Sequence, residues 1–193
     1  MSADKWNRIY EGKTDTPVTC DVLTENVHLL PKTGLALDVA CGLGGNAEFL
    51  ATHGLTVDAW DISEIAIDKL NKRTLETHLP IRASVKDISP ADFTSMTYDL
   101  ILVNHYLDRK LAPAMMRALR AGGMLLYQTF TQTKVSNSGP SNPDYLLERN
   151  ELLSLFSGLS VVVFRDEQAV GDVEQGSRNQ SLLVAQKLIS ETH

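Results

Sequence analysis

The sequence predicts an α/β fold: a doubly wound, mostly parallel seven-stranded sheet with a C-terminal antiparallel hairpin strand. Three observations lead to this fold class. Apolar, strand-like runs alternate with stretches of helical periodicity along most of the chain. A glycine-rich turn, "ACGLGGN" at residues 40–46, separates the first strand from the next helix. Two β-rich runs then follow one another near the end of the sequence, as in an antiparallel pair. Strands that alternate with helices form parallel sheets, and such sheets bind ligands beyond the carboxyl ends of their strands.

The elements are expected in a regular order. Seven runs are predicted strands, at residues 35–40, 55–61, 80–87, 98–104, 124–130, 159–170 and 178–188. The predicted helices cover residues 17–30, 46–53, 63–78, 111–120 and 151–156. Ser63 is expected to cap the helix that follows it, and the Gly122–Gly123 pair is expected to end the helix at 111–120.

Two polar segments fall outside this alternation. Residues 1–16 are mixed and polar, and we expect them to form an N-terminal cap segment over the site. Residues 131–145 are rich in Pro, Gly, Ser and Asn and are expected to form a lid loop, because long loops in compact domains often cover a site.

Composition limits the class of protein. A chain of 193 residues suits a single domain over 1–193. The net charge of −6 and the lack of a Lys/Arg block argue against nucleic acid or a membrane as partner. No apolar run approaches the roughly 20 residues of a membrane span. Two cysteines and no signal-peptide pattern favour a reducing, cytoplasmic location. Nothing in the sequence sets an oligomeric state.

The glycine-rich turn is compatible with two kinds of ligand. Ala40, Gly42 and Gly45 fit a dinucleotide-binding G-x-G-x-x-G pattern with one substitution, and Asp61 lies at about the distance expected of a ribose-binding carboxylate. However, Asp38 lies inside the first strand, where its charge would repel a diphosphate and attract a cation. The turn alone therefore leaves NAD and a cationic cofactor both open.

The ordered set of motifs resembles the class I S-adenosylmethionine-dependent methyltransferases, which have a Rossmann-like fold. "LDVACGLGGN" is similar to the first motif of the family, an acid followed by a Gly-rich turn. Asp61 in "DAWDIS" matches the second motif, and Asp87 followed by Ile88 matches the third. The loop after "YDLILVN" and the C-terminal hairpin match the remaining ones. The resemblance implies methyl transfer from S-adenosyl-L-methionine.

The resemblance also implies roles for single residues. Asp61 is expected to accept hydrogen bonds from both ribose hydroxyls of the cofactor, a type of bond worth about 1.5–3 kcal/mol. Asp87 is expected to accept from the adenine amino group, with Ile62 and Ile88 against the ring faces. Tyr10, in a "WNRIY" opening similar to a Trp-x-x-x-Tyr motif of one branch, is expected to fold over the cofactor.

Further roles concern the methionine end of the cofactor. The carbonyls of Ala40 and Asn104 are expected to take the ammonium group, and Asp38 to orient the amides of the turn and favour a cation. Asn46 is expected either to cap the helix or to reach the cofactor carboxylate. Gly42 and Gly44 are expected to let the backbone approach the ligand closely.

The sequence indicates the methyl acceptor less clearly than the cofactor. "YQTF", "GPSNPDYLLERNELLSLF" and "QGSRNQSLLVAQK" resemble the small tellurite-resistance and thiopurine-type branch of the family, which implies a small-molecule acceptor, an anion or a thiol. His105 is a candidate base or anion contact, with an ordinary exposed loop histidine as the alternative. Arg178 and Arg165 are candidate anion contacts, and each is otherwise a surface charge of the hairpin. Cys41 is expected to be a packing residue.

Two other functions stay open at this stage. An NAD-binding oxidoreductase would use the same turn, and a catalytically silent protein would bind S-adenosylmethionine without transferring its methyl group. We expect no catalytic metal, because the histidines show no metal-ligand spacing.

Overall fold

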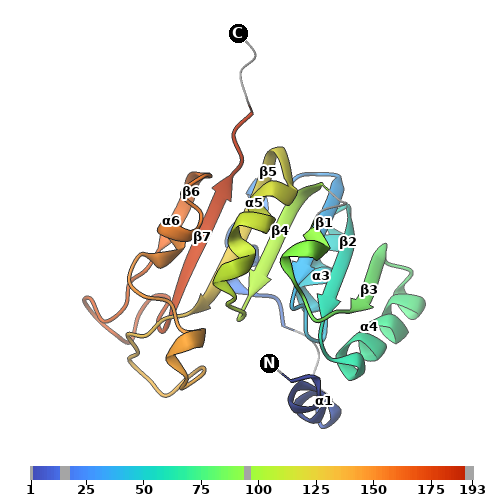
Figure 1. Cartoon of the computed structure of the whole chain (residues 1–193), viewed down its shortest axis with the longest axis horizontal. Helices are drawn as coiled ribbons and strands as arrows, with labels where there is room; N and C mark the ends of the chain where they lie inside the picture. The colour runs from blue at the N-terminus through green and yellow to red at the C-terminus, as the bar shows by residue number, and fades with distance from the viewer. Residues whose placement is uncertain (1, 14–17, 94–96, 190–193) are drawn as a thin grey trace.

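The computed structural model describes residues 2–13, 18–93 and 97–189. Residues 14–16 of the expected cap segment, Pro17 and His193 lie outside the described residues. The centre of the fold is a seven-stranded sheet with the strand order β3-β2-β1-β4-β5-β7-β6 (Figure 1). The strands are β1 (Gly34–Val39), β2 (Leu55–Asp61), β3 (Ile81–Val85), β4 (Tyr98–Asn104), β5 (Leu119–Phe130), β6 (Ser160–Arg165) and β7 (Gln180–Gln186).

The pairing of the strands confirms the predicted fold class. All neighbours from β3 to β5 are parallel, whereas β7 runs antiparallel to both β5 and β6. The winding reverses between β1 and β4, since β2 and β3 lie on one side of β1 and the later strands lie on the other. Ligands of open α/β sheets bind at such a reversal, beyond the carboxyl ends of the strands.

Helices cover both faces of the sheet. The α-helices are α1 (Ala3–Glu11), α2 (Asp21–Thr24), α3 (Gly45–Thr52), α4 (Glu64–Thr77), α5 (Ala112–Ala118) and α6 (Glu151–Leu155). Short 3₁₀ turns are η1 (Val27–Leu29), η2 (Pro90–Phe93), η3 (Arg109–Leu111) and η4 (Pro143–Tyr145). Alternate residues of β4 divide between the two cores: Ile101 and Val103 pack with α5 and α6, and Leu100 and Leu102 pack with α2, α3 and α4.

Two of the predicted helices differ clearly from the structure. The predicted helix at 17–30 is reduced to α2 and η1. The predicted helix at 111–120 ends at Ala118, and β5 continues through both Gly122 and Gly123. The physical reason is a close backbone approach: a Cβ on Gly123 would lie 2.9 Å from the carbonyl oxygen of Tyr98 in β4. The two glycines therefore admit an irregular strand start and do not terminate the helix.

The N-terminal segment also differs, because residues 3–11 form a helix. Figure 1 shows α1 beyond the carboxyl ends of the parallel strands, at the edge opposite to the one where β7 ends. None of its residues is buried. Within the described part of the chain, no helix combines the length and the apolar character that crossing a membrane requires.

Candidate functional site

The turn after β1 is left-handed at three positions. Ala40, Gly42 and Gly44 have φ angles of 56°, 53° and 82°. A Cβ on Gly42 would lie 2.7 Å from the hydroxyl oxygen of Tyr10, and one on Gly44 would lie 2.5 Å from a methyl carbon of Leu70. Glycine is thus required at both positions by conformation and by space. Ala40 adopts the same conformation with a side chain, at some cost in strain.

Asp61 joins this turn to the turn after β2. Its Oδ2 accepts a hydrogen bond from the Gly42 amide at 2.8 Å, and its Oδ1 accepts one from the Ser63 amide at 2.8 Å. The residue is buried, and burial raises the pKa of its carboxyl group while the two amides oppose that shift. Each carboxylate oxygen can accept a further hydrogen bond, so Asp61 is able to bind two hydroxyls from one rigid position.

Asp38 lies beneath the turn with only 1% of its surface exposed. Neither of its carboxylate oxygens has a hydrogen-bond partner, although the amide of Ala47 favours the charged form. Burial and the nearby charge of Asp61 raise the pKa of Asp38 to about 8. An unpaired buried carboxylate is costly unless it is protonated or a cation comes near it.

Asn104 ends β4 beside this turn. Val39 and Val103 are paired in the β1–β4 register, so Ala40 and Asn104 follow them at the same edge of the sheet. The side-chain Oδ1 of Asn104 is buried and has no hydrogen-bond partner. An unsatisfied buried acceptor at a ligand edge is the group that a donor such as an ammonium would satisfy.

A cavity of about 770 Å³ opens at this edge, within the usual size range for small-molecule sites. Every residue predicted to contact the cofactor lines it, except Asp38, which is buried below. A second wall comes from α1, and a third from the loop after β4, Phe130, and the segment containing Gly139 and Tyr145.

Relatives of known type agree with this geometry. A family model described as a methyltransferase domain matches residues 36–123. A probable S-adenosyl-L-methionine-dependent methyltransferase, TehB of Haemophilus influenzae, is 31% identical over 87 residues, which are 44% of this chain and 30% of that protein. The ubiquinone biosynthesis O-methyltransferase of Coxiella burnetii is 27% identical over 140 residues, which are 68% of this chain and 59% of the relative. The crystal structure of the Haemophilus influenzae TehB superposes with a TM-score of 0.71 at 22% identity, covering 95% of this chain and 67% of the other.

The chain has the fold of the class I S-adenosylmethionine-dependent methyltransferases, and its residues 36–123 match a methyltransferase domain. It spans between about a third and three fifths of the length of the curated relatives it matches. S-adenosyl-L-methionine is the methyl donor of this family, and the residues present fit it. The chain places two unpartnered acceptors here, the Asp38 carboxylate and the Asn104 Oδ1, and such acceptors favour a cationic ligand over a diphosphate.

Helix α1 is held over the cavity by hydrogen bonds to α4 and its N-cap residue. The Lys69 ammonium donates to the carbonyl oxygens of Tyr10 at 2.6 Å and Lys13 at 2.7 Å. The Ser63 hydroxyl donates to Asn7 Oδ1 at 2.6 Å. Sequence reasoning missed this helix, although Trp6 and Tyr10 at a spacing of four residues are the signal, and their rings stack at 5.7 Å.

Asn46 does not cap α3, contrary to one of the two expected roles. Gly44 occupies the N-cap position, and Asn46 Oδ1 accepts a hydrogen bond from the Cys20 amide at 2.9 Å. The residue lines the cavity while holding the start of α2. Cys41 is buried and burial raises the pKa of its thiol, which agrees with a packing role.

Aromatic rings line the part of the cavity beside the loop after β4. His105, at a φ of 53°, stacks on Phe130 with the ring centroids 4.5 Å apart. Tyr106 and Tyr145 also line this end, and burial raises the pKa of Tyr106 to about 12, so that its hydroxyl is a donor at neutral pH. Phe130 and Tyr145 lie within the quoted stretches "YQTF" and "GPSNPDYLLERNELLSLF", but sequence reasoning assigned neither of them a role in the site.

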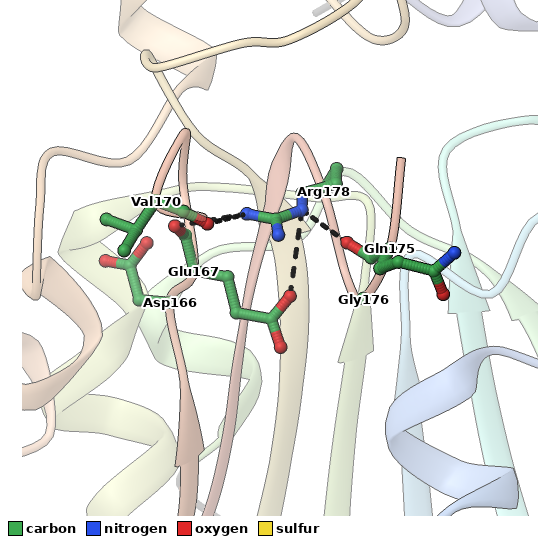
Figure 2. Close-up of a pocket in the computed structure, with 6 residues that line it drawn as sticks. All are labelled: Asp166, Glu167, Val170, Gln175, Gly176 and Arg178. Carbon is green, nitrogen blue, oxygen red and sulfur yellow. Dashed lines mark hydrogen bonds and ion pairs between the residues drawn. The ribbon is translucent and has the colours of Figure 1, made fainter. Parts of the chain in front are cut away.

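Arg178 is a correction to the predicted acceptor site. It does not line this cavity but a separate hollow of about 400 Å³ in the loop between β6 and β7 (Figure 2). Its guanidinium donates to five backbone carbonyl oxygens of that loop: Glu167, Gln168, Val170, Asp172 and Gln175. These bonds occupy the guanidinium N–H groups that would otherwise bind an anionic acceptor. Arg165 is likewise engaged, with Glu25 at 3.0 Å.

Proposed function

We propose that this chain transfers the methyl group of S-adenosyl-L-methionine to a small molecule that binds between the loop after β4 and the segment 131–145. The observation that carries the proposal is the shape of the one cavity at the switch point, where a polar wall built by the turn, Asp61 and Asn104 faces a wall of rings. The first wall suits the cofactor, and the second leaves room for a separate acceptor.

On the cofactor side, the chain supplies fixed acceptors. Asp61 is held by two backbone amides, so it binds the ribose hydroxyls without reorganising. Asp87 is exposed at the cavity and follows β3, where it accepts from the adenine amino group, with Ile62 and Ile88 at the ring. Asp38 and the Asn104 side chain favour the cationic methionine end. When bound, the cofactor supplies a methyl group that its sulfonium already activates.

On the acceptor side, the chain supplies orientation and cover. His105, Tyr106, Phe130 and Tyr145 present ring faces and edges, which align a planar or apolar molecule and exclude water. None of these four side chains carries a fixed positive charge. Three lysines line the cavity elsewhere. Lys5 lies over the Trp6 ring at 6.0 Å, Lys13 faces the Tyr10 ring at 5.8 Å, and Lys86 lies over Trp60 at 3.9 Å.

This arrangement changes the expected acceptor class. An anionic acceptor depended on the guanidinium of Arg178, and that group is engaged in the hairpin loop. The ring-lined wall favours a neutral small molecule that reacts through a hydroxyl or a thiol. We therefore propose a small-molecule acceptor that reacts through a hydroxyl or a thiol, and an oxyanion is the second candidate.

Two measurements test the proposal. In thermal-shift and calorimetric titrations, S-adenosylmethionine and S-adenosylhomocysteine are expected to bind, and NAD and NADP are not; equal binding of NAD would overturn the cofactor assignment. In a transfer assay with a labelled methyl group, panels of thiols, hydroxyl compounds, oxyanions, protein and nucleic acid are offered. Label on small thiols or hydroxyl compounds supports the proposal. Label confined to nucleic acid or protein, or no transfer despite cofactor binding, overturns it.

A further inference from the structure

We propose that two glutamines, Gln128 and Gln180, hold His105 in the tautomer that carries its proton on Nε2, which makes the bare Nδ1 the proton acceptor for the methyl-accepting group. This inference rests on the proposed function. It deepens it by stating that the acceptor reacts through an atom that still carries a proton.

The assignment starts from a donor of known identity. The backbone N–H of Val22 can only donate, and it lies 2.7 Å from the side-chain oxygen Oε1 of Gln128. Gln128 is 2% exposed, so its amide has no alternative partner in bulk water. The contact with Val22 thus fixes which end of the Gln128 amide is oxygen and which is nitrogen.

The orientation of the Gln128 amide also determines the orientation of the Gln180 amide. The Gln128 amide nitrogen lies 2.9 Å from Gln180 Oε1, and a second contact at 3.5 Å leads to Asp21 Oδ2. Because an amide NH₂ group only donates, the atom of Gln180 that faces it must be the oxygen. The same oxygen lies 3.0 Å from His105 Nε2. A carbonyl oxygen only accepts, so His105 Nε2 must carry the proton.

The rest of the ring environment leaves the other nitrogen available. The His105 backbone amide donates to the Gln128 carbonyl at 2.9 Å, and the ring stacks on Phe130. Across residues 2–13, 18–93 and 97–189, the structure shows no hydrogen bond to His105 Nδ1, and His105 lines the cavity. Partial burial lowers the pKa of the imidazole, while the bond to Gln180 and the charge of Asp21 oppose that shift, so the neutral ring is favoured.

The unprotonated Nδ1 of His105 can accept the proton that the methyl-accepting group loses. An acceptor X–H forms its new bond to the methyl carbon, the sulfonium sulfur keeps the electron pair of the bond that breaks, and the proton of X passes to His105 Nδ1. The products are X–CH₃, the neutral thioether and an imidazolium that later returns its proton to water. A preformed oxyanion needs no such base, so the arrangement selects hydroxyl or thiol acceptors.

Nitrogen NMR of the full chain with ¹⁵N-labelled histidine tests the tautomer directly, without any acceptor. The His105 signals are identified by their loss in His105→Asn. At a pH where the ring is neutral, Nδ1 is expected to show the shift of an unprotonated nitrogen and Nε2 that of a protonated one. The reverse pattern, or an equal mixture, overturns the inference and leaves the proposed methyl transfer standing.

Variants test the role of the glutamines. Gln180→Leu is expected to convert the single tautomer into a mixture and to lower kcat at least about tenfold with little change in KM. Gln180→Glu is expected to keep the tautomer and raise the pKa of His105, which moves the acidic limb of the kcat–pH profile to higher pH. Gln175→Leu, at an exposed glutamine of the β6–β7 loop, is the matched control and is expected to change neither readout. An unchanged tautomer in Gln180→Leu overturns the positioning role.

Discussion

The carboxylate of Asp61 accepts a hydrogen bond from the amide of Gly42 at 2.8 Å, across 19 positions of the sequence. This bond joins the end of β2 to the left-handed turn after β1, so one carboxylate both shapes the turn and faces the cavity. The proposed ribose site and the conformation of the glycine turn therefore depend on the same side chain.

Replacing Asp61 by alanine is expected to weaken S-adenosylmethionine binding about tenfold or more, because charge-assisted hydrogen bonds to two hydroxyls are lost. Calorimetry gives the dissociation constant, and circular dichroism checks that the protein is folded. Asp68→Ala, an exposed carboxylate on α4, is the control and is expected to bind normally. An unchanged dissociation constant for Asp61→Ala would remove this residue from the cofactor site.

Asp38 predicts how stability depends on pH. Its pKa is about 8 in the folded protein, above the ordinary value of 3.8, so the folded state binds the extra proton between these values. The free energy of unfolding is thus expected to fall as pH rises from about 4 toward 8, with about 1.4 kcal/mol for each unit of pKa difference. In Asp38→Asn this part of the pH dependence is expected to disappear, as measured by urea unfolding at several pH values. Parallel pH profiles for the two proteins would show that Asp38 is ionised in the fold.

Saturating S-adenosylmethionine is expected to reduce the pH dependence of the free energy of unfolding that Asp38 causes in the wild-type protein. A cation near the buried carboxylate favours its charged form, so cofactor binding at pH 7 is expected to release protons. Calorimetry in buffers of different ionisation enthalpy counts these protons. Binding without proton release would contradict a cationic group beside Asp38.

Lys69, which anchors α1 over the cavity, is expected to slow the dissociation of the bound cofactor. Lys69→Met removes the ammonium that binds the carbonyls of Tyr10 and Lys13, and leaves the Ser63 bond to Asn7 in place on a helix with no buried residue. The dissociation rate of S-adenosylmethionine is expected to rise several-fold, since the cover over the site opens more often. Stopped-flow displacement measures the rate, and hydrogen exchange of residues 3–11 is expected to rise with it.

Lys72→Met, an exposed lysine of the same helix, is the control. Hydrogen exchange with and without ligand also tests the expectation that residues 131–145 act as a lid, because Gly139 and Tyr145 line the cavity. Equal dissociation rates in Lys69→Met and the wild-type protein would show that α1 does not retain the cofactor.

Much of the fold was predictable because local patterns decide it. β2 and β4 begin and end where the apolar runs at 55–61 and 98–104 do, and Ser63 caps α4 by accepting from the Ala66 amide at 3.2 Å. The residues proposed to bind the cofactor could be found from topology, since acids and glycines at the ends of neighbouring parallel strands must meet at one edge.

The features that sequence reasoning missed depend on contacts between distant residues. The bond between Gln128 and Gln180 spans 52 positions, and the one between His105 and Gln180 spans 75. They exist because β7 inserts between β5 and β6, an order that no local pattern specifies. Arg178 shows the reverse error: a basic residue near a strand start was interpreted as a ligand contact, whereas the hairpin loop curls around its guanidinium.

Arg178 is therefore expected to support the hairpin loop and not the acceptor. Its side chain is 13% exposed, and Lys in its place cannot reach several carbonyls from one planar fork. Arg178→Lys is expected to lower stability by about 1–3 kcal/mol, since backbone acceptors lose their donors, and to leave the cofactor dissociation constant and the acceptor KM unchanged. Thermal unfolding and steady-state kinetics on one preparation separate these effects. Lys187→Arg is the control, because it exchanges the same two residue types in the opposite direction. Lys187 also binds backbone carbonyls, at the other edge of the sheet. A raised KM with unchanged thermal stability in Arg178→Lys would return this residue to the acceptor site, because only a ligand contact would then account for the loss.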